Sequence, residues 1–456
     1  MSFKSTFIAD RAFYKKAAAV AIPSMFQQLL STMINLVDNL IVASIGDTAL
    51  SGVTAANRVY SIAMFAIMAL CQTAVVFFAQ YHGAKDLKHT KDTIRIGLII
   101  SVIAILPFFL AAYLFPYQVI SLLTKDPQVI EMGVQYLRVA CWTYPILPFT
   151  MIIANVLRAV GDAKTPLVIS TFAILLNAFF SFTLIYGYFG FPAIGVAGAA
   201  VGTLIAQLVF LTILILVLVH RKYDFFPKAT SFLKLNFKLT IRILKKALPL
   251  TLNEIGWSAG MTTLFALYSY KGLEVMTAYS MSMTISDMVF VLFNGMGVAT
   301  TVMVARHLGA NELDVAKSNA YKLLFLSTVT AIVMGMCLFF AAPYLTLLYT
   351  HVGQSERDIA NYILRIQGCM FFIYTFSTQI YFTLRAGGDM RSTLFMDSVF
   401  MWTVNIPFMY CLIHYSGLSI FGIYFLGQCT DLIKLFIGFY VFKREKWVHN
   451  LTTEEV

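Results

Sequence analysis

The sequence carries little charge. Asp, Glu, Lys and Arg make up only 12% of its 456 residues, about half the fraction that is usual in soluble proteins. A hydrophobic fraction of 59%, with 40 Phe and 23 Tyr, accompanies this scarcity. The composition excludes a soluble enzyme with a single membrane anchor, because too little polar sequence remains to build its soluble domain. It predicts a polytopic membrane protein whose function lies among its helices.

Side chains for covalent chemistry are also scarce. None of the seven histidines falls in the middle of an apolar stretch, and the six cysteines do not have metal-binding spacing. The sequence contains neither a Gly-rich phosphate loop with a lysine nor the paired Asp or Ser/Lys spacing of an intramembrane enzyme. We therefore expect no enzymatic activity, no resident cofactor and no use of ATP.

Long apolar stretches are abundant. A stretch of about 20 apolar residues suits a helix that crosses a hydrocarbon core of roughly 30 Å. Twelve such stretches predict an all-α polytopic fold with 12 transmembrane helices. The predicted spans are residues 17–43, 53–80, 96–116, 130–155, 167–189, 195–219, 243–268, 276–304, 320–348, 359–383, 393–414 and 420–441.

The distribution of basic residues predicts the orientation of the chain. With the N-terminus inside, the predicted cytoplasmic segments hold 26 Lys and Arg residues and the opposite loops hold three. Basic residues concentrate on the cytoplasmic side of membrane proteins, so both termini are predicted to be cytoplasmic. The expected location is the cell inner (cytoplasmic) membrane, with lipid as the surroundings. The topology explains the net charge of +11, and we expect no nucleic-acid partner.

The two halves of the sequence repeat one another. The stretch KKAAAVAIPSMFQQLL (15–30) is echoed by RILKKALPLTLNEIGW (242–257), so that Pro23 aligns with Pro249. In almost the same register, LRAVGDAKTPL (157–167) is echoed by LRAGGDMRSTL (384–394). A repeat of six predicted helices gives both halves the same orientation in the membrane. Parallel repeats of this kind form two bundles around a central cavity and suit alternating access in a transporter.

This repeat predicts the domain organisation. A six-helix N-terminal lobe is expected at residues 1–219 and a six-helix C-terminal lobe at residues 247–441. A basic cytoplasmic linker at residues 220–246 joins them and runs into helix 7, and residues 442–456 form a cytoplasmic tail.

Several motifs resemble the multidrug and toxic compound extrusion (MATE) family. The resemblance covers the whole chain and implies a secondary active exporter that works as a monomer by rocker-switch alternating access. The substrates implied are small organic cations or amphipathic drugs, exported by antiport against Na⁺ or H⁺. The motifs are VDNLIVASIG (37–46), LRAVGDAKTPL (157–167), GVAGAAVGTLIAQ (195–207), LRAGGDMRSTL (384–394) and KWVHNLT (446–452).

Two other transporter classes are weighed against this resemblance. The major facilitator superfamily also has two six-helix halves, but the loop after the second predicted helix, HGAKDLKHTKDTIR (82–95), lacks its basic motif. A lipid-linked substrate flippase of the MATE superfamily remains the alternative. It would need a more cationic cavity to hold phosphates, and the intramembrane charges of this sequence are mainly acidic.

Asp38 stands in the middle of the first predicted helix. A charged group there costs roughly 2.5–3.5 kcal/mol on an insertion scale, and such residues usually bind ions or protons. The resemblance places the family's helix-1 acid on Asp38 and adds Asn177, Ser181 and Thr203 from helices 5 and 6. The oxygens of Asp38, Asn177 and Thr203 are hard ligands suited to Na⁺. Ser181 stands where the family often has a second Asp, so the sequence leaves the choice between Na⁺ and H⁺ open.

The second half contains further acids that we expect to bind substrate or a second proton. They are Glu254, with Trp257 three residues later, together with Asp287 and Asp397. For Asp397, a capping or solvated position near the cytoplasmic face is the alternative. Asp431 has Lys434 at i+3 on the same helix, a spacing that predicts an ion pair between them.

Pro23 and Pro249 occupy equivalent positions in the first helix of each half. A proline inside a helix removes one backbone N–H and allows a bend. The resemblance makes Pro23 a candidate hinge, with Pro249 as its counterpart. A static kink at each position is the alternative.

Overall fold

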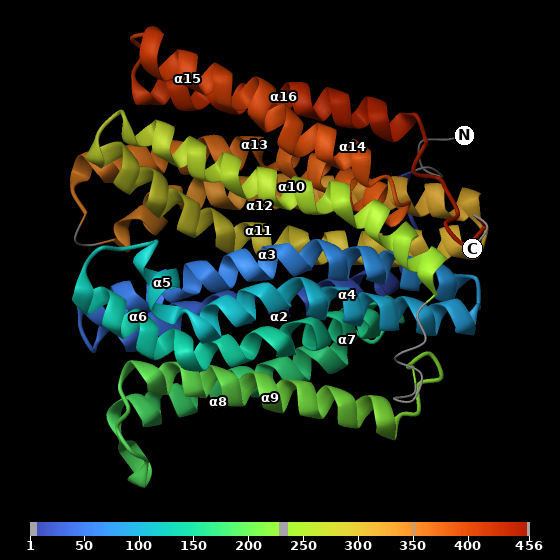
Figure 1. Cartoon of the computed structure of the whole chain (residues 1–456). Helices are drawn as coiled ribbons and strands as arrows, with labels where there is room; N and C mark the ends of the chain where they lie inside the picture. The colour runs from blue at the N-terminus through green and yellow to red at the C-terminus, as the bar shows by residue number, and fades with distance from the viewer. Residues whose placement is uncertain (1–6, 228–235, 350–351, 454–456) are drawn as a thin grey trace. The chain divides into compact units, whose positions relative to one another are not determined.

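The computed structural model describes residues 7–227, 236–349 and 352–453. These residues form helices joined by short turns, and none of them lies in a strand (Figure 1). The predicted all-α fold is therefore confirmed. Each of the twelve predicted spans falls on a helix or on a run of consecutive helices. Within the described ranges, nine helices or helical runs are long and apolar enough to cross a membrane. The full count of twelve spans and the cytoplasmic termini stay predictions.

Three further helices have the length of a span but a more polar composition. They are α2 (Arg11–Ala43), α10 (Phe237–Ser269) and α13 (Gln354–Ala386), each with 33 residues. At a rise of 1.5 Å per residue, a helix of this length extends about 50 Å. Their polar residues include Asp38, Glu254 and Arg385, which belong to the polar contacts described below.

The chain divides into two compact units. The continuous unit contains the described residues of 26–245, and the discontinuous unit contains those of 1–25 and 246–455. The chain passes between the units inside α2, after Met25, and inside α10, after Lys245. The predicted linker 220–246 is described at 220–227 and 236–246, while its residues 228–235 lie outside the described ranges.

The continuous unit is a bundle of long helices that bury an apolar core. Its fully buried side chains include Ile67, Leu137 and Tyr144 from three different parts of the chain. The break between α6 and α7 falls in the 3₁₀ segment η1 (Cys141–Ile146), which contains Pro145. Besides part of α2 and the first part of α10, its helices are α3 (Asp47–Gly83), α4 (Leu87–Leu114), α5 (Pro116–Ser121), α6 (Pro127–Ala140), α7 (Leu147–Ala159), α8 (Lys164–Tyr186) and α9 (Val196–His220).

Helices α8 and α9 pack against each other through two glycines of α9. A Cβ atom on Gly202 would lie 2.5 Å from the Ser181 hydroxyl oxygen and 2.7 Å from the Ser181 backbone nitrogen. A Cβ atom on Gly198 would lie 2.7 Å from the Leu184 carbonyl carbon. The spacing of the two glycines is the GxxxG pattern that allows membrane helices to approach backbone to backbone. This close approach brings Thr203 of α9 beside Asn177 of α8.

The discontinuous unit contains α10, α11 (Leu273–Gly309), α12 (Leu313–Leu347), α13 and α16 (Ile420–Lys443), with a broken helix between α13 and α16. The broken helix consists of α14 (Met390–Leu394), two π-helical segments, η4 (Phe395–Val399) and η5 (Met401–Asn405), and α15 (Ile406–Tyr415). Pro407 has no N–H to continue the regular hydrogen-bond ladder into η5. Such π-turns occur often at functional sites, and η4 carries Asp397.

The two copies of the repeated loop fold alike. Asp162 accepts hydrogen bonds from the Thr165 backbone N–H (3.1 Å) and hydroxyl (2.7 Å). Asp389, at the equivalent position of the second copy, accepts them from the Ser392 backbone N–H (3.2 Å) and hydroxyl (2.7 Å). Partial burial works to raise the pKa of Asp162, but the hydrogen bonds from Thr165 and Tyr223 and the charge of Arg221 lower it below its usual value.

The end of the described chain packs into the discontinuous unit. Trp447 is fully buried, and its indole N–H donates to the Phe442 carbonyl at 3.0 Å. The Asn450 amide donates to the Gly309 carbonyl at 3.4 Å. The Trp447 carbonyl oxygen fills the space beside Gly387, where a Cβ atom would lie only 1.8 Å away. The predicted tail is therefore an integral part of this unit as far as residue 453.

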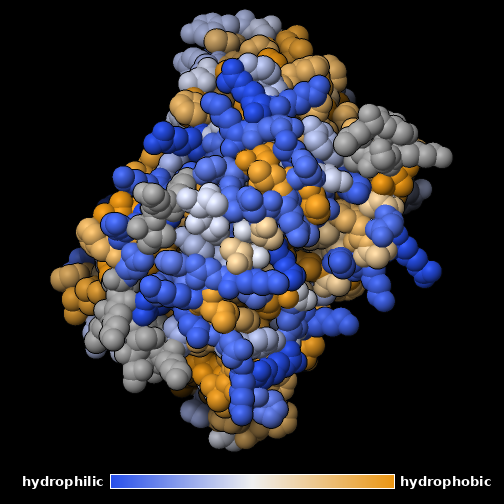
Figure 2. Space-filling view, turned by 90° about the vertical axis from the view of Figure 1, so that its right-hand side faces the viewer, coloured by the Kyte–Doolittle hydropathy of each residue, from blue (hydrophilic) through white to orange (hydrophobic). Residues whose placement is uncertain are grey.

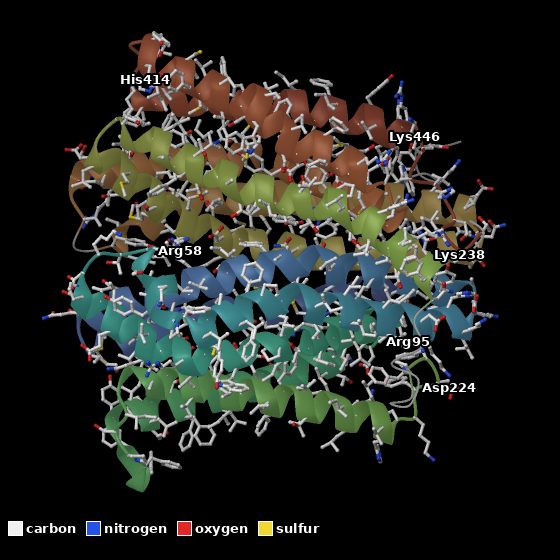
Figure 3. All side chains as sticks on the ribbon, in the orientation of Figure 1. Arg58, Arg95, Asp224, Lys238, His414 and Lys446 are labelled. Atoms are coloured by element: carbon white, nitrogen blue, oxygen red, sulfur yellow. The ribbon has the colours of Figure 1, made fainter. Side chains whose placement is uncertain are left out.

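Charged residues lie at the ends of both units. Arg95, Asp224 and Lys238 lie at one end of the continuous unit, and His414 and Lys446 lie at opposite ends of the discontinuous unit (Figure 3). Figure 2 faces the side of the molecule that is at the right of Figure 1, and hydrophilic residues predominate on it. Which of these ends faces the cytoplasm stays a prediction from the distribution of basic residues.

Candidate cation and transport sites

Asp38 of α2 contacts the Asn177 amide of α8, which in turn contacts the Thr203 hydroxyl of α9. The Asn177 amide satisfies both of its neighbours when its nitrogen faces Asp38. The nitrogen then donates to the two carboxylate oxygens at 2.9 and 3.1 Å, and the amide oxygen accepts from the Thr203 hydroxyl at 3.0 Å. An ionised carboxylate can only accept, so this orientation is the one in which the amide nitrogen donates to Asp38 and the amide oxygen accepts from Thr203. The structure thus brings Asp38, Asn177 and Thr203 together.

The polar contacts extend to two more helices. The Tyr136 hydroxyl of α6 lies close to Thr203 and donates to the Asn57 side-chain oxygen of α3 at 3.5 Å. Among the described residues, no Lys, Arg or His lies within ion-pair distance of Asp38. The partly buried carboxylate is therefore held by neutral groups alone. Such a carboxylate retains a net negative charge with which to attract a proton or a metal cation.

Ser181 makes no contact with Asp38, but its hydroxyl and that of Thr203 both reach the Ala199 carbonyl of α9, at 3.5 and 3.1 Å. It is one turn beyond Asn177 on α8 and is fully buried. Its contact with the Gly202 backbone explains its small size. Of the four residues expected at the cation site, Ser181 is thus linked to the group through the Ala199 carbonyl that it shares with Thr203.

Glu254 of α10 forms an ion pair with Arg385 of α13. The two side chains are 3.0 Å apart and only 10% and 12% exposed. The sequence shows no basic residue near Glu254 on its own helix, because the partner comes from another helix. The continuous unit has a matching contact, in which Arg158 donates to the neutral Gln27 at 2.9 Å. Arg158 and Arg385 occupy equivalent positions in the repeated loop motif. This repetition is the sequence feature from which a shared structural role of the two arginines could have been predicted.

The other residues predicted in the second half lie in different surroundings. Trp257 is 38% exposed, whereas Glu254 is 7% exposed, so the ring and the carboxylate do not share an environment. Asp287 lies on an exposed stripe of α11 with Ser280 and Thr284. Their spacing of four and then three residues places them on one face of the helix. A hollow of about 310 Å³, lined in part by Met276, Ser280 and Thr284, borders the same stripe.

Asp397 pairs with Lys434, which corrects two expectations. The Lys434 ammonium lies 2.8 Å from Asp397, and both side chains are more than four-fifths buried. The predicted i+3 pair of Lys434 with Asp431 is wrong, as is a solvated capping position for Asp397. A pair within one helix is worth only about 0.2–0.5 kcal/mol. The contact of Lys434 with Asp397 is more favourable than the pair with Asp431 because it also gives the buried Asp397 carboxylate a counter-charge.

The prolines lie close to the places where the chain changes units. Pro23 is inside α2, two residues before Met25, the last residue of α2 in the discontinuous unit. Pro249 is inside α10, three residues after the chain enters that unit at Lys246. A bend at either position would therefore fall next to the boundary between the units.

Comparisons with known proteins agree with the repeat. The MatE family model matches the chain twice, at residues 23–183 and 249–411, beginning at Pro23 and Pro249. The chain is 24% identical over 376 residues to the probable multidrug resistance protein YoeA of Bacillus subtilis (strain 168), covering 81% of each. It is 22% identical to the probable multidrug resistance protein NorM of Thermotoga maritima, covering 92% of this chain and 89% of that protein.

Solved structures show the same fold. An outward-facing multidrug resistance transporter of the MATE family superimposes with a TM-score of 0.84 at 18% identity, covering 95% of this chain and 96% of that one. A transporter from Pyrococcus furiosus gives a TM-score of 0.85 at 19% identity, with the same coverage. Because the two family-model matches together span more than half of its length, this chain is a multi-pass membrane transporter of the MATE family.

Proposed function

We propose that this protein is a secondary active multidrug exporter of the cell inner membrane, functional as a monomer. It antiports organic cations or amphipathic compounds against Na⁺ or H⁺ by rocker-switch alternating access. The names of its relatives in Bacillus subtilis and Thermotoga maritima as multidrug resistance proteins support the substrate class. The contact of Asp38 with Asn177, which also contacts Thr203, is the observation that carries the coupling mechanism.

When the Asp38 group binds its ion, hydrogen bonds from neutral groups to the carboxylate are replaced by the positive charge of the ion. With its nitrogen toward Asp38, the Asn177 amide stabilises the ionised carboxylate. A proton neutralises Asp38 directly and gives it a hydrogen to donate. A bound Na⁺ needs oxygen ligands, so the Asn177 amide turns its oxygen to Asp38, and Thr203 adds its hydroxyl. Either ion removes the net charge from the site and thereby changes the free-energy difference between conformations of the transporter.

Helix α2 connects this chemistry to the movement of the units. Asp38 and Pro23 lie on the same helix, one on each side of the boundary after Met25. A change of charge at Asp38 alters how the second part of α2 packs in the continuous unit. We propose that the bend at Pro23, with its counterpart at Pro249, absorbs the difference as the units rock.

The exposed stripe of α11 is the proposed contact for substrate. A carboxylate exposed to lipid is strongly unfavourable, so Asp287, with Ser280 and Thr284, suits a water-filled path better than a lipid face. Its charge complements an organic cation, and the exposed Trp257 ring offers a surface for stacking. Glu254, whose charge Arg385 already balances, instead positions α10 against α13.

Transport by reconstituted protein tests this proposal. Proteoliposomes containing wild type, Asp38→Asn or Asp47→Asn are given an imposed Na⁺ or pH gradient, and export of cationic dyes is measured. Asp47 is an exposed residue at the start of α3, so its substitution removes an equal charge outside the site. We expect one gradient to drive export, and Asp38→Asn, but not Asp47→Asn, to abolish it. Undiminished coupled export by Asp38→Asn would remove Asp38 from the mechanism, and absence of export under both gradients would reject the exporter.

A further inference from the structure

The buried charges of the discontinuous unit form a site that is unlike the Asp38 group. Asp397 accepts hydrogen bonds from three directions. Lys434 of α16 donates at 2.8 Å, Asn253 of α10 at 3.3 Å and the Tyr381 hydroxyl of α13 at 3.3 Å. The carboxylate itself is on η4, so four separate elements converge on it. The carboxylate and the phenol oxygen are groups that bind small cations, and the Asn253 amide, which donates to the carboxylate, holds it in place.

The Lys434 ammonium occupies the position of the cation in this site. It contacts the Asp397 carboxylate at 2.8 Å, lies close to the Tyr381 hydroxyl and is 5.2 Å from the centre of the Tyr381 ring. Only 18% of the Lys434 side chain and 11% of the Asp397 side chain are exposed. A buried ammonium with a carboxylate, a hydroxyl and a ring face around it is bound as a free cation would be.

The supporting residues hold the site in shape without Lys434. The Ser398 hydroxyl donates to the Asn253 carbonyl at 2.6 Å, and the Ser398 backbone N–H donates to the Asn253 side-chain oxygen at 3.3 Å. These bonds orient the Asn253 amide toward Asp397. A Cβ atom on Gly256 would lie 2.9 Å from the Ser398 Cβ, so α10 and η4 are in close contact. Removal of the lysine side chain therefore leaves the oxygen-bearing groups in place.

The other charged groups nearby do not replace Lys434. Arg385 approaches Asp397 closely enough to influence its charge, but Glu254 balances the guanidinium at 3.0 Å. Asp431, one turn from Lys434 on α16, adds a second negative charge near the same ammonium. Removing the ammonium would thus leave an excess of negative charge around Asp397.

The repeat shows that this charge pair is peculiar to the second half. In the register of the loop motifs, Asp397 and Lys434 align with Ser170 and Gln207, which are both neutral. Conversely, the Asn177 and Thr203 pair has a counterpart in Asn405 and Thr430, which are 2.7 Å apart. In the register that aligns Pro23 with Pro249, Asp38 aligns with the apolar Leu264, so that second copy lacks the carboxylate. Each half has a charged site at a position where the other half is neutral.

We propose that Asp397 and Tyr381, with Asn253 holding the carboxylate in position, form a monovalent-cation site whose occupant is the chain's own Lys434 ammonium. The site takes no ion from solution while Lys434 fills it. Substitution of Lys434 by alanine opens it to Na⁺ or to a small alkylammonium ion. The discontinuous unit thus carries a built-in cation, whereas the Asp38 group of the continuous unit exchanges its cation with solution, as the proposed function requires.

Thermal unfolding of purified protein in detergent tests this assignment without requiring transport. All variants carry Asp38→Asn, so that Na⁺ binding at that group does not contribute. The probes are NaCl and ethylammonium chloride, compared with N-methylglucamine chloride at equal ionic strength. For Lys434→Ala we expect a lowered unfolding temperature that rises saturably with either probe, because a cation that binds only the folded state stabilises it. The Asp38→Asn parent should not respond.

The charge-neutral control is the Asp397→Asn/Lys434→Ala double substitution, which lacks the carboxylate and should not respond to either cation. A folded Lys434→Ala variant that responds to neither probe would overturn the proposal. An equal response of the double variant would also overturn it, because the cation would then act elsewhere. If Lys434→Ala does not fold, Lys434→Met, which retains the apolar stem, is measured by the same criteria. A failure of export by wild-type protein would reject the proposed function and leave this test untouched.

Discussion

Substitution of Glu254 tests how the first helix of the second half is held. The Glu254→Gln change keeps the shape of the side chain and removes its charge, which leaves the Arg385 guanidinium in a buried place without its carboxylate. Both side chains are about nine-tenths buried at a separation of 3.0 Å. Breaking a buried ion pair from one side costs about 3–5 kcal/mol, because the remaining charge stays desolvated. An exposed pair would contribute only about 0–1 kcal/mol.

A double-mutant cycle separates the pair from its surroundings. The free energy of unfolding is measured in detergent for wild type, Glu254→Gln, Arg385→Gln and the double substitution. We expect each single change to destabilise the protein by about 3–5 kcal/mol and the double change to restore much of the loss. In the same variants, export of cationic and neutral dyes should fall in parallel, because Arg385 already balances the charge of Glu254. Additive single effects, or a selective loss of cationic dyes, would refute this reasoning.

Two further predictions concern other parts of the fold. The hydrogen bonds that lower the pKa of Asp162 stabilise the protein above the carboxyl's ordinary pKa, and this contribution is lost as the pH falls through the lowered value. Below about pH 4 the unfolding temperature of wild type should therefore fall more steeply than that of Asp162→Asn, and parallel curves would contradict this role. A Cβ atom on Gly295 of α11 would lie 2.8 Å from the Ala21 carbonyl oxygen of α2, so Gly295→Ala should destabilise the protein by about 1–3 kcal/mol and slow export. The control is Gly422→Ala, where the added Cβ atom would lie 3.7 Å from its nearest neighbour. This substitution should change neither the free energy of unfolding nor export.

The proximity of Asp38, Asn177 and Thr203 could be predicted from the sequence motifs around these residues. The GxxxG spacing of Gly198 and Gly202 predicts close contact of α9 with another helix. The resemblance to the MATE family supplied the rest, by placing the acid of the first helix beside residues of the fifth and sixth. For this group the local pattern and the family motif agree.

The partners of Glu254 and Lys434 are not predictable in the same way. A basic side chain at i+3 or i+4 is visible in the sequence, and it favours Asp431 as the partner of Lys434. Which carboxylate a long lysine side chain reaches depends on how α16 packs against η4, and on which acid lacks other partners. This choice is a property of tertiary packing. The repeat motif gave a stronger signal, since equivalent arginines suggest equivalent contacts.

The sequence repeat indicates the π-helical segments only by a shift of one residue. In the register of the loop motifs, which aligns Asp162 with Asp389, Asn177 falls opposite Val404. The contact equivalent to that of Asn177 with Thr203 is instead made by Asn405, one residue further along, with Thr430. The extra residue is accommodated between these landmarks, where η4 and η5 wind more widely than an α-helix. A drift of one residue in a repeat predicts such a bulge in principle.

The division of the chain into a continuous and a discontinuous unit also constrains its synthesis. Residues 26–245 follow one another without interruption, so this unit is complete in the membrane while the ribosome is still translating the second half. The first part of α2 can pack into the discontinuous unit only once α11 and α12 have been synthesised. Trp447 can pack into the same unit only after α16 has been synthesised. At about 5–20 residues per second, the roughly 200 residues after Lys245 take about 10–40 s to make. During that interval the alanine-rich face of α2 around Ala17 and Ala21 has no partner from its own unit.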